Sequence, residues 1–165
     1  MNPKDYYTSI NLKSTKLYDY LTSLSFDELT WFEHFGFQAS EVDISWLDKD
    51  PALTAIHKIQ PIKQLGILKV LPNSFYDWHV DLHRLSSINM LIKHKHSHCL
   101  FGELKDEHHI NVLELIYQPQ TYYLLNTKKY HSVLNFEESR YMFSLYFEDE
   151  IDYTSLKAKL KDLHD

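Results

Sequence analysis

Apolar residues in the first third of the chain recur at a spacing close to 3.6 residues, which predicts helices. One amphipathic helix is indicated by the i, i+3, i+4, i+7 pattern of Leu17, Tyr20, Leu21 and Leu24. A second is expected to start near Ser25, with an acidic first turn and Gly36 as its stop. Asp50-Pro51 is typical of a third start. We therefore predict a helical layer over residues 1–63.

From about residue 64 the pattern changes to short β-branched and aromatic runs separated by turn residues, which is typical of antiparallel strands. The predicted strands are 65–71, 76–80, 86–92, 97–102, 110–117, 121–125, 131–134 and 140–147. Strands without intervening helices favour a closed or double-sheet roll over 64–148. Leu156, Leu160 and Leu163 lie at helical spacing, so residues 149–165 are expected to form a C-terminal helix packed outside.

Composition narrows the class of protein. A length of 165 residues predicts a single domain, 1–165, with enough apolar residues for its own core. A net charge of -6 disfavours a diffuse grip on nucleic acid. No signal-like start and no apolar run of about 18 residues is present, so we expect no membrane partner. The single cysteine, Cys99, cannot form an internal disulfide, which favours a reducing cytoplasm.

Two histidines and an aspartate offer metal-ligand chemistry. His79 and Asp81 are two residues apart, so on an extended strand both side chains would point to the same face. His131 follows His79 by 131 − 79 = 52 residues, which leaves room for the strands that bring the chain back beside the first pair. Two imidazoles and one carboxylate are the ligand set of mononuclear non-haem Fe(II) oxygenases.

Arg140 follows His131 by 140 − 131 = 9 residues, and 135–139 reads as a hairpin connection. Arg140 would then lie opposite residue 134, roughly 10 Å along the strands from His131. That distance is about the reach of a metal-chelated five-carbon dicarboxylate, and arginine presents a fork of donors that binds a carboxylate bidentately. The alternative is an ion pair between Arg140 and Glu137 or Glu138 across the turn.

These residues resemble the Fe(II)- and 2-oxoglutarate-dependent dioxygenases, whose motif is His-x-Asp, a distal His and then Arg. The resemblance covers about residues 65–148 and implies a mainly β fold with flanking helices, the jelly-roll or cupin-like double-stranded β-helix. It implies His79, Asp81 and His131 as catalytic iron ligands and Arg140 as the residue that binds the far carboxylate of 2-oxoglutarate. Asn89 and Arg84 are further candidates for contact with the co-substrate.

Residues 125–140 are similar to the aspartyl/asparaginyl β-hydroxylase branch of that family and to small phage or bacterial relatives. Well-known members of the branch lack the carboxylate ligand, whereas Asp81 is present here and also argues against a halogenase. The resemblance implies an oxidoreductase that hydroxylates an amino-acid side chain, free or in a peptide or protein, with release of succinate and CO2. We expect a small-molecule, peptide or protein substrate and a monomer or homodimer.

Other features have two interpretations each. A cupin-like metal or small-molecule binding protein without turnover would share the β-roll pattern. His94, His96 and His98 alternate ahead of Cys99, which is typical of a solvated loop or edge and also compatible with an adventitious metal site. Four aromatic residues near the motifs are candidates either for a substrate pocket or for the core: Tyr76, Trp78, Tyr122 and Tyr130.

Overall fold

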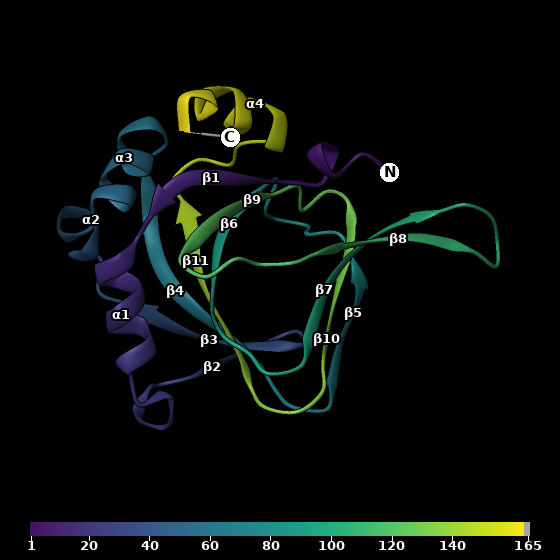
Figure 1. The fold of residues 1–165 in the computed structure, drawn as a ribbon, viewed down its shortest axis with the longest axis horizontal. Helices are drawn as coiled ribbons and strands as arrows, with labels where there is room; N and C mark the ends of the chain where they lie inside the picture. Colours follow the sequence, from purple (N-terminus) through teal and green to yellow (C-terminus); the bar gives the residue numbers. More distant parts are fainter. Residues whose placement is uncertain (164–165) are drawn as a thin grey trace.

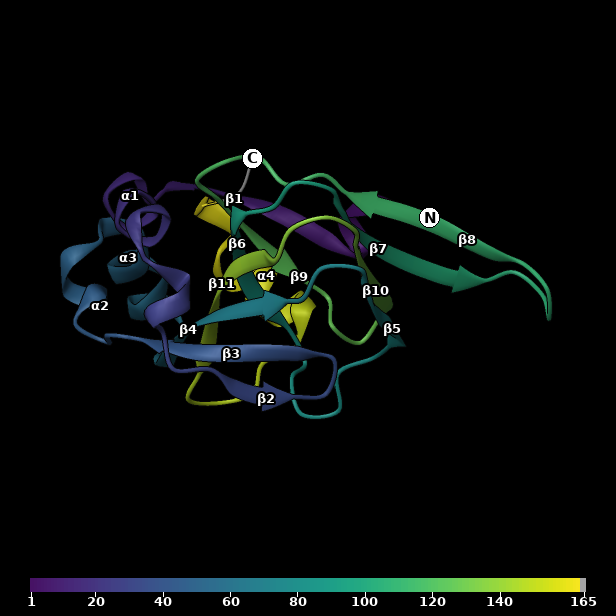
Figure 2. The ribbon, with the colours of Figure 1, turned by 90° about the horizontal axis from the view of Figure 1, so that it is seen from below.

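Two antiparallel sheets face each other in the computed structural model, which describes residues 1–163 (Figures 1 and 2). The larger sheet has the order β1-β9-β6-β11-β4-β3-β2 and the smaller one β5-β10-β7-β8. The strands are β1 (Tyr7–Lys13), β2 (Phe32–His34), β3 (Phe37–Val42), β4 (Ile62–Val70), β5 (Ser74–His79), β6 (Ser87–Lys93), β7 (Ser97–Leu104), β8 (Ile110–Leu115), β9 (Thr121–Leu125), β10 (Tyr130–Asn135) and β11 (Arg140–Phe147).

The eight strands predicted beyond residue 64 are all present, as β4 to β11, with ends shifted by no more than three residues. In the orders β9-β6-β11-β4 and β5-β10-β7 no neighbours are consecutive in the chain, because the strands pass back and forth between the two sheets and enclose a roll. The hairpin of β7 and β8 extends beyond the roll as a long arm (Figure 1). The prediction of a mainly β roll with flanking helices is confirmed.

Side chains of the large sheet alternate between two environments, as the strand repeat of two residues requires. One set packs into the core beneath the helices, represented by Ile88, Met90 and Ile92 of β6 and by Tyr141, Phe143 and Leu145 of β11. The opposite parity faces the space between the two sheets, which we call the interior of the roll. That set comprises Ser87, Asn89 and Leu91 of β6 and Arg140, Met142 and Ser144 of β11.

Helices cover the outer face of the large sheet (Figure 2). They are α1 (Thr15–Ser23), α2 (Trp46–Lys49), α3 (Pro51–Ile59) and α4 (Tyr153–Lys159), with short 3-10 turns at Pro3–Asp5, Phe26–Glu28 and Lys161–Leu163. The predicted start at Asp50-Pro51 is confirmed, since the Asp50 carboxylate accepts from the Leu53 amide at 3.0 Å. Within residues 1–163 no helix has the length and apolar character needed to cross a bilayer.

The expectation of a helical layer over residues 1–63 is wrong in three places, because β1, β2 and β3 lie there. The predicted helix from Ser25 to Gly36 is a single 3-10 turn followed by the β2–β3 hairpin. Gly36 has a φ of +81° and therefore serves as a turn residue rather than a helix stop. Pairing of β3 with the edge of β4 satisfies the backbone there and overrides the helical apolar spacing.

The C-terminal segment is helical as predicted, from Tyr153 to Lys159, and continues as the 3-10 turn Lys161–Leu163. Tyr153, Leu156 and Leu160 are buried against the rest of the core. The predicted segment extends to residue 165, and residues 164–165 lie outside the described part of the chain.

Asp50 joins α3 to the sheet, so its removal should destabilise the fold. Its carboxylate accepts from the Leu53 amide and from the Ser14 hydroxyl at 2.6 Å, and Ser14 also contacts the Tyr122 hydroxyl at 2.8 Å. Asp50→Ala should lower the free energy of unfolding by about 2 kcal/mol, from the lost cap and the lost hydrogen bond of buried Ser14. Urea unfolding of this variant beside the exposed Asp48→Ala measures the difference; equal losses would contradict this role.

Candidate metal and co-substrate site

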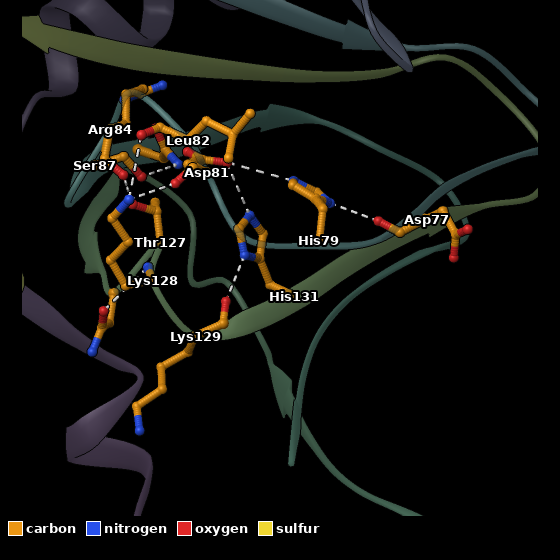
Figure 3. Close-up of polar contacts among 12 residues, drawn as sticks. Asp77, His79, Asp81, Leu82, Arg84, Ser87, Thr127, Lys128, Lys129 and His131 are labelled. Carbon is orange, nitrogen blue, oxygen red and sulfur yellow. Dashed lines mark hydrogen bonds and ion pairs between the residues drawn. The ribbon is translucent and has the colours of Figure 1, made fainter. Parts of the chain in front are cut away.

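The site begins with two histidines that face each other across adjacent strands of the small sheet. His79 ends β5, and His131 lies near the start of β10 as its direct partner in the antiparallel register. Their ring centroids are 4.2 Å apart (Figure 3). Residues 52 positions apart in the sequence (131 − 79) are thus brought side by side, as predicted from the spacing.

Asp81 reaches the same point from outside the sheet. The prediction that His79 and Asp81 share one extended strand is wrong, because β5 ends at His79 and the register with β10 shifts between His131 and Val133. Asp81 lies on the irregular segment that leads to β6. Its Oδ1 atom is nevertheless 3.5 Å from His79 Nε2 and 3.6 Å from His131 Nε2.

Backbone carbonyls fix the orientation of both rings. His79 Nδ1 lies 2.6 Å from the carbonyl oxygen of Asp77, and His131 Nδ1 lies 2.9 Å from that of Lys129. A carbonyl only accepts, so each Nδ1 carries the proton and donates it. Each Nε2 is then left with a lone pair directed at Asp81, which is the arrangement that metal-ligating histidines adopt.

The surroundings of Asp81 favour its ionised carboxylate, and the pKa values of the two neighbouring histidines shift in opposite directions. Burial acts to raise the pKa of Asp81, but its proximity to the rings of His79 and His131 and to the Arg84 charge outweighs burial and holds the pKa below its ordinary value. Burial also lowers the pKa of His131, which favours the neutral ring that a metal requires. For His79 burial acts in the same direction, yet its contacts with Asp81 and Asp77 raise the pKa overall.

The residues present fit a divalent metal ion. One atom from each of the three side chains lies within 4.8 Å of the others, and this is the sole such group among the described residues. His79 Nε2 is buried with no hydrogen-bond partner, so it is an acceptor without a donor. Ligands at about 2.1 Å on adjacent octahedral positions are about 3 Å apart, so small movements would bring these donors into range. Two histidines and one carboxylate leave three such positions open.

Arg140 is the first residue of β11 and faces the interior of the roll. The predicted hairpin between β10 and β11 is wrong, because the two strands belong to different sheets and Arg140 pairs with Val70 of β4. The connection crosses the roll because buried Asn135 donates to the carbonyls of Val70, Leu71 and Glu138 at 2.8–3.0 Å.

The Arg140 side chain is 2% exposed and has no carboxylate partner within residues 1–163. Its guanidinium lies over the Tyr117 ring, 5.5 Å from the centroid, and its Nη2 is 3.8 Å from Met142 Sδ. The alternative ion pair with Glu137 or Glu138 is wrong, since these glutamates pair with Lys95 and Lys93. The charge of Arg140 is therefore buried without a carboxylate partner among the described residues, and such burial is costly.

Asn89 and Arg84, the other two predicted co-substrate contacts, differ in whether their polar atoms already have protein partners. Asn89 faces the interior of the roll from β6, is 5% exposed, and has a buried Oδ1 without a partner. Arg84 already has protein partners, because its Nη2 donates to Ser144 Oγ at 3.1 Å and to the Leu145 carbonyl at 2.9 Å. Contact with a co-substrate stays a prediction for both.

Of the four aromatic residues singled out from the sequence, Tyr76 borders the site, with its ring 4.1 Å from that of His79. Tyr122 belongs to the core beneath the helices and Tyr130 is exposed. Trp78 faces Gly102 of β7.

The alternating histidines do not converge into a metal site. His98 pairs with Glu114 at 2.6 Å, His96 lies 3.7 Å from Glu137, and His94 contacts Ser97. The solvated-edge interpretation agrees with these partners.

The sequence offered no sign of several groups that support the site. Phe37, on the β2–β3 hairpin, packs against Tyr76 with ring centroids 5.6 Å apart, and that hairpin was predicted as a helix. The carbonyls of Asp77 and Lys129 are backbone groups, which any residue type supplies. Lys128, whose ammonium contacts the backbone of Asp81, stood in a run of turn residues with no feature to distinguish it.

Comparison with solved structures identifies the fold. The structure is similar to a prolyl-4-hydroxylase of Pseudomonas putida, with a TM-score of 0.57 and 15% identity over 86% of this chain and 90% of that one. It is also similar to a viral collagen prolyl hydroxylase from Paramecium Bursaria Chlorella virus-1, with a TM-score of 0.54 and 13% identity over 86% and 95% of the two chains. A scan of protein-family models and a search of curated proteins find no match. The fold is therefore the double-stranded β-helix expected from the sequence.

Metal binding should stabilise the protein and depend on Asp81. At a free Mn(II) concentration about a hundredfold above its Kd, binding adds about 2.7 kcal/mol to the free energy of unfolding. Asp81→Ala should abolish most of this gain. Asp77→Ala is the control for loss of a nearby negative charge, because it removes a carboxylate close to His79 and keeps the backbone carbonyl that holds the ring. Thermal unfolding with and without Mn(II) measures the effect, and an undiminished gain in Asp81→Ala would exclude this site.

Proposed function

We propose that this protein is an Fe(II)- and 2-oxoglutarate-dependent oxygenase that hydroxylates an amino-acid side chain, free or within a peptide or protein. The observation that carries the proposal is the convergence of His79 Nε2, His131 Nε2 and an Asp81 oxygen at one end of a double-stranded β-helix. This ligand set with open positions is characteristic of non-haem Fe(II) oxygenases. His79, Asp81 and His131 would hold the iron.

Arg140 supplies the second part of the proposal. Within β10, Asn135 lies four residues beyond His131, about 13 Å along the strand, and the chain then crosses to Arg140. An arginine side chain together with a five-carbon dicarboxylate is long enough to cover that separation. A dicarboxylate with one end at the metal ligands would place its far carboxylate at the Arg140 guanidinium, and the buried charge would gain a bidentate partner. Asn89 lies on the same interior face with a free Oδ1.

When bound, Fe(II) and 2-oxoglutarate would supply oxidation of the substrate by O2. In this reaction 2-oxoglutarate is converted to succinate and CO2, and a substrate C–H becomes C–OH. The protein provides placement and charge. His79 and His131 present lone pairs fixed by their carbonyl partners, Asp81 contributes the negative charge, and the interior apolar residues around Arg140 exclude water.

The exposure of the site supports an amino-acid side chain of the substrate as the group that is oxidised. The His79 and Asp81 side chains are each 22% exposed and that of His131 is 12%, so the ligands lie at an opening rather than in a closed core. Exposed Leu82 and the Tyr76 ring border this opening. Apolar borders suit the side chain of an amino acid held in a larger molecule. Both similar structures are named as prolyl hydroxylases, which agrees with this class of substrate.

Loss of Arg140 should separate binding of the co-substrate from binding of the metal. Arg140→Met keeps the volume and removes the charge, so the Kd for 2-oxoglutarate should rise about a hundredfold, equivalent to about 3 kcal/mol. The Kd for metal should stay within about twofold of the parent. Anaerobic titration of the Fe(II) protein with 2-oxoglutarate, followed by its visible charge-transfer band, measures the first quantity. Lys93→Met, an exposed cation on neighbouring β6, is the control and should leave both Kd values unchanged.

Measurements on the parent protein, with and without O2, test the proposal as a whole. The parent should show the charge-transfer band and form succinate from 2-oxoglutarate in the presence of O2. Metal binding that is indifferent to 2-oxoglutarate, with no succinate formed, would contradict the oxygenase and favour the cupin-like binding protein. Arg140→Met should melt no lower than the parent without ligands, because replacing an unpaired buried charge by an apolar group is neutral or stabilising.

A further inference from the structure

The three metal ligands are supported unequally. His79 and His131 are held by the ladder between β5 and β10, whereas Asp81 follows the end of β5 on a segment without strand pairing. Leu82, the next residue, is 79% exposed and adds no packing. A carboxylate ligand needs a fixed position, so other contacts must supply what the ladder does not.

We propose that Lys128 is a positioning residue for the ligand Asp81, and that the turn 126–129 between β9 and β10 holds the carboxylate and a histidine ligand together. The inference rests on the proposed metal site and extends it to residues that do not touch the metal. Figure 3 shows Thr127 and Lys128 to the left of His131, near Asp81, and Lys129 below His131.

Lys128 contacts the irregular segment directly. Its Nζ donates to the Asp81 carbonyl at 2.8 Å and lies 3.4 Å from the Leu82 carbonyl. A charged donor shared by two successive carbonyls fixes the peptide plane that follows Asp81, and this plane sets the direction of the Asp81 side chain. Hydrogen bonds with one charged partner are stronger than neutral ones, which suits an exposed lysine to this role.

Thr127 holds the same segment from the other side. Its carbonyl accepts from the Asp81 amide at 2.9 Å, so the backbone of Asp81 is bonded to the turn through both its N–H and its C=O. The Thr127 hydroxyl, which is buried, donates to the Arg84 carbonyl at 2.6 Å. The turn therefore grips residues 81 and 84, on both sides of exposed Leu82.

Lys129 connects the turn to the second histidine, because its carbonyl accepts from His131 Nδ1. The turn itself is fixed to the N-terminal part of the chain: the Asn126 amide donates to the Tyr6 carbonyl at 2.8 Å, and the Asn126 side chain donates to the Asp5 carbonyl at 3.0 Å. Consequently a single anchored turn sets the positions of Asp81 and the His131 ring relative to each other.

Removal of the Lys128 charge has two opposite effects on metal affinity, and the direction of the observed change distinguishes them. Loss of a positive charge close to a cation site would by itself favour cation binding. Loss of the bonds that fix Asp81 would weaken it, because the carboxylate would have to be ordered when the metal binds. Weaker binding after removal of Lys128 therefore reports position and not charge.

The test compares two neighbouring lysines in the full-length protein. Lys128→Met removes the donor, whereas Lys129→Met removes a side chain whose Nζ lies over the Tyr6 ring and leaves the Lys129 carbonyl in place. Mn(II) affinity is measured by calorimetry and the visible spectrum of the Co(II) protein reports ligand geometry. We expect Lys128→Met to raise the Kd for Mn(II) about tenfold and to alter the Co(II) spectrum, and Lys129→Met to change neither. Lys128→Arg, which keeps a charged donor, should restore most of the affinity.

Equal or tighter Mn(II) binding by Lys128→Met would overturn the inference, as would equal weakening by both methionine variants. Melting temperatures without metal separate positioning from folding, since Lys128 is exposed and Lys128→Met should melt within a degree or so of Lys129→Met. The proposed oxygenase activity fails independently: a parent that binds Mn(II) but forms no succinate from 2-oxoglutarate with Fe(II) would refute the activity, while the comparison of the two lysines would still decide the role of Lys128.

Discussion

The antiparallel pairing of β10 with β5 is the constraint on which the rest of the site depends. It places His131 opposite His79 and brings the two Nε2 atoms to the same carboxylate. β10 also pairs with β7, so it lies inside the small sheet and is held on both edges. A slip of one residue would turn His131 to the opposite face of the sheet, because side chains alternate along a strand. The positions of the two histidines and the register of the roll are therefore specified by the same hydrogen bonds.

Much of this arrangement could be predicted from local patterns. Alternation and turn residues located β4 to β11, and the chemistry of His79, Asp81 and His131 identified three side chains that the structure brings together. The N-terminal strands were missed because Phe32 and its neighbours have an apolar spacing that also fits a helix. β3 pairs with β4 and β1 pairs with β9, and both partners are distant in the sequence, so tertiary contacts decide between the two.

Two errors concern where strands end and which sheet they join. Asp81 was expected on a strand, and only the register with β10 shows that β5 stops at His79. The connection from β10 to β11 has the length of a hairpin, but Asn135 binds carbonyls near the end of β4 and directs the chain across the roll. Crossing places Arg140 between the sheets, near Cys99 and Tyr117, where its charge has no carboxylate partner among the described residues. Neither the end of β5 nor the crossing from β10 to β11 can be predicted from the composition or the hydrophobic periodicity of the sequence.

Because Asp81 lies on an irregular segment, the contacts that hold it should open more often than those that hold the two histidines. The backbones of the two histidines are held by the ladder of β5 and β10, whose opening approaches unfolding of the small sheet. The carboxylate is released when a few bonds to the turn 126–129 break, and local openings of that kind are far more frequent than global unfolding. Exchange of a metal at the proposed site should consequently follow the opening of this segment, and many such exchanges should fit within the lifetime of a single folded state.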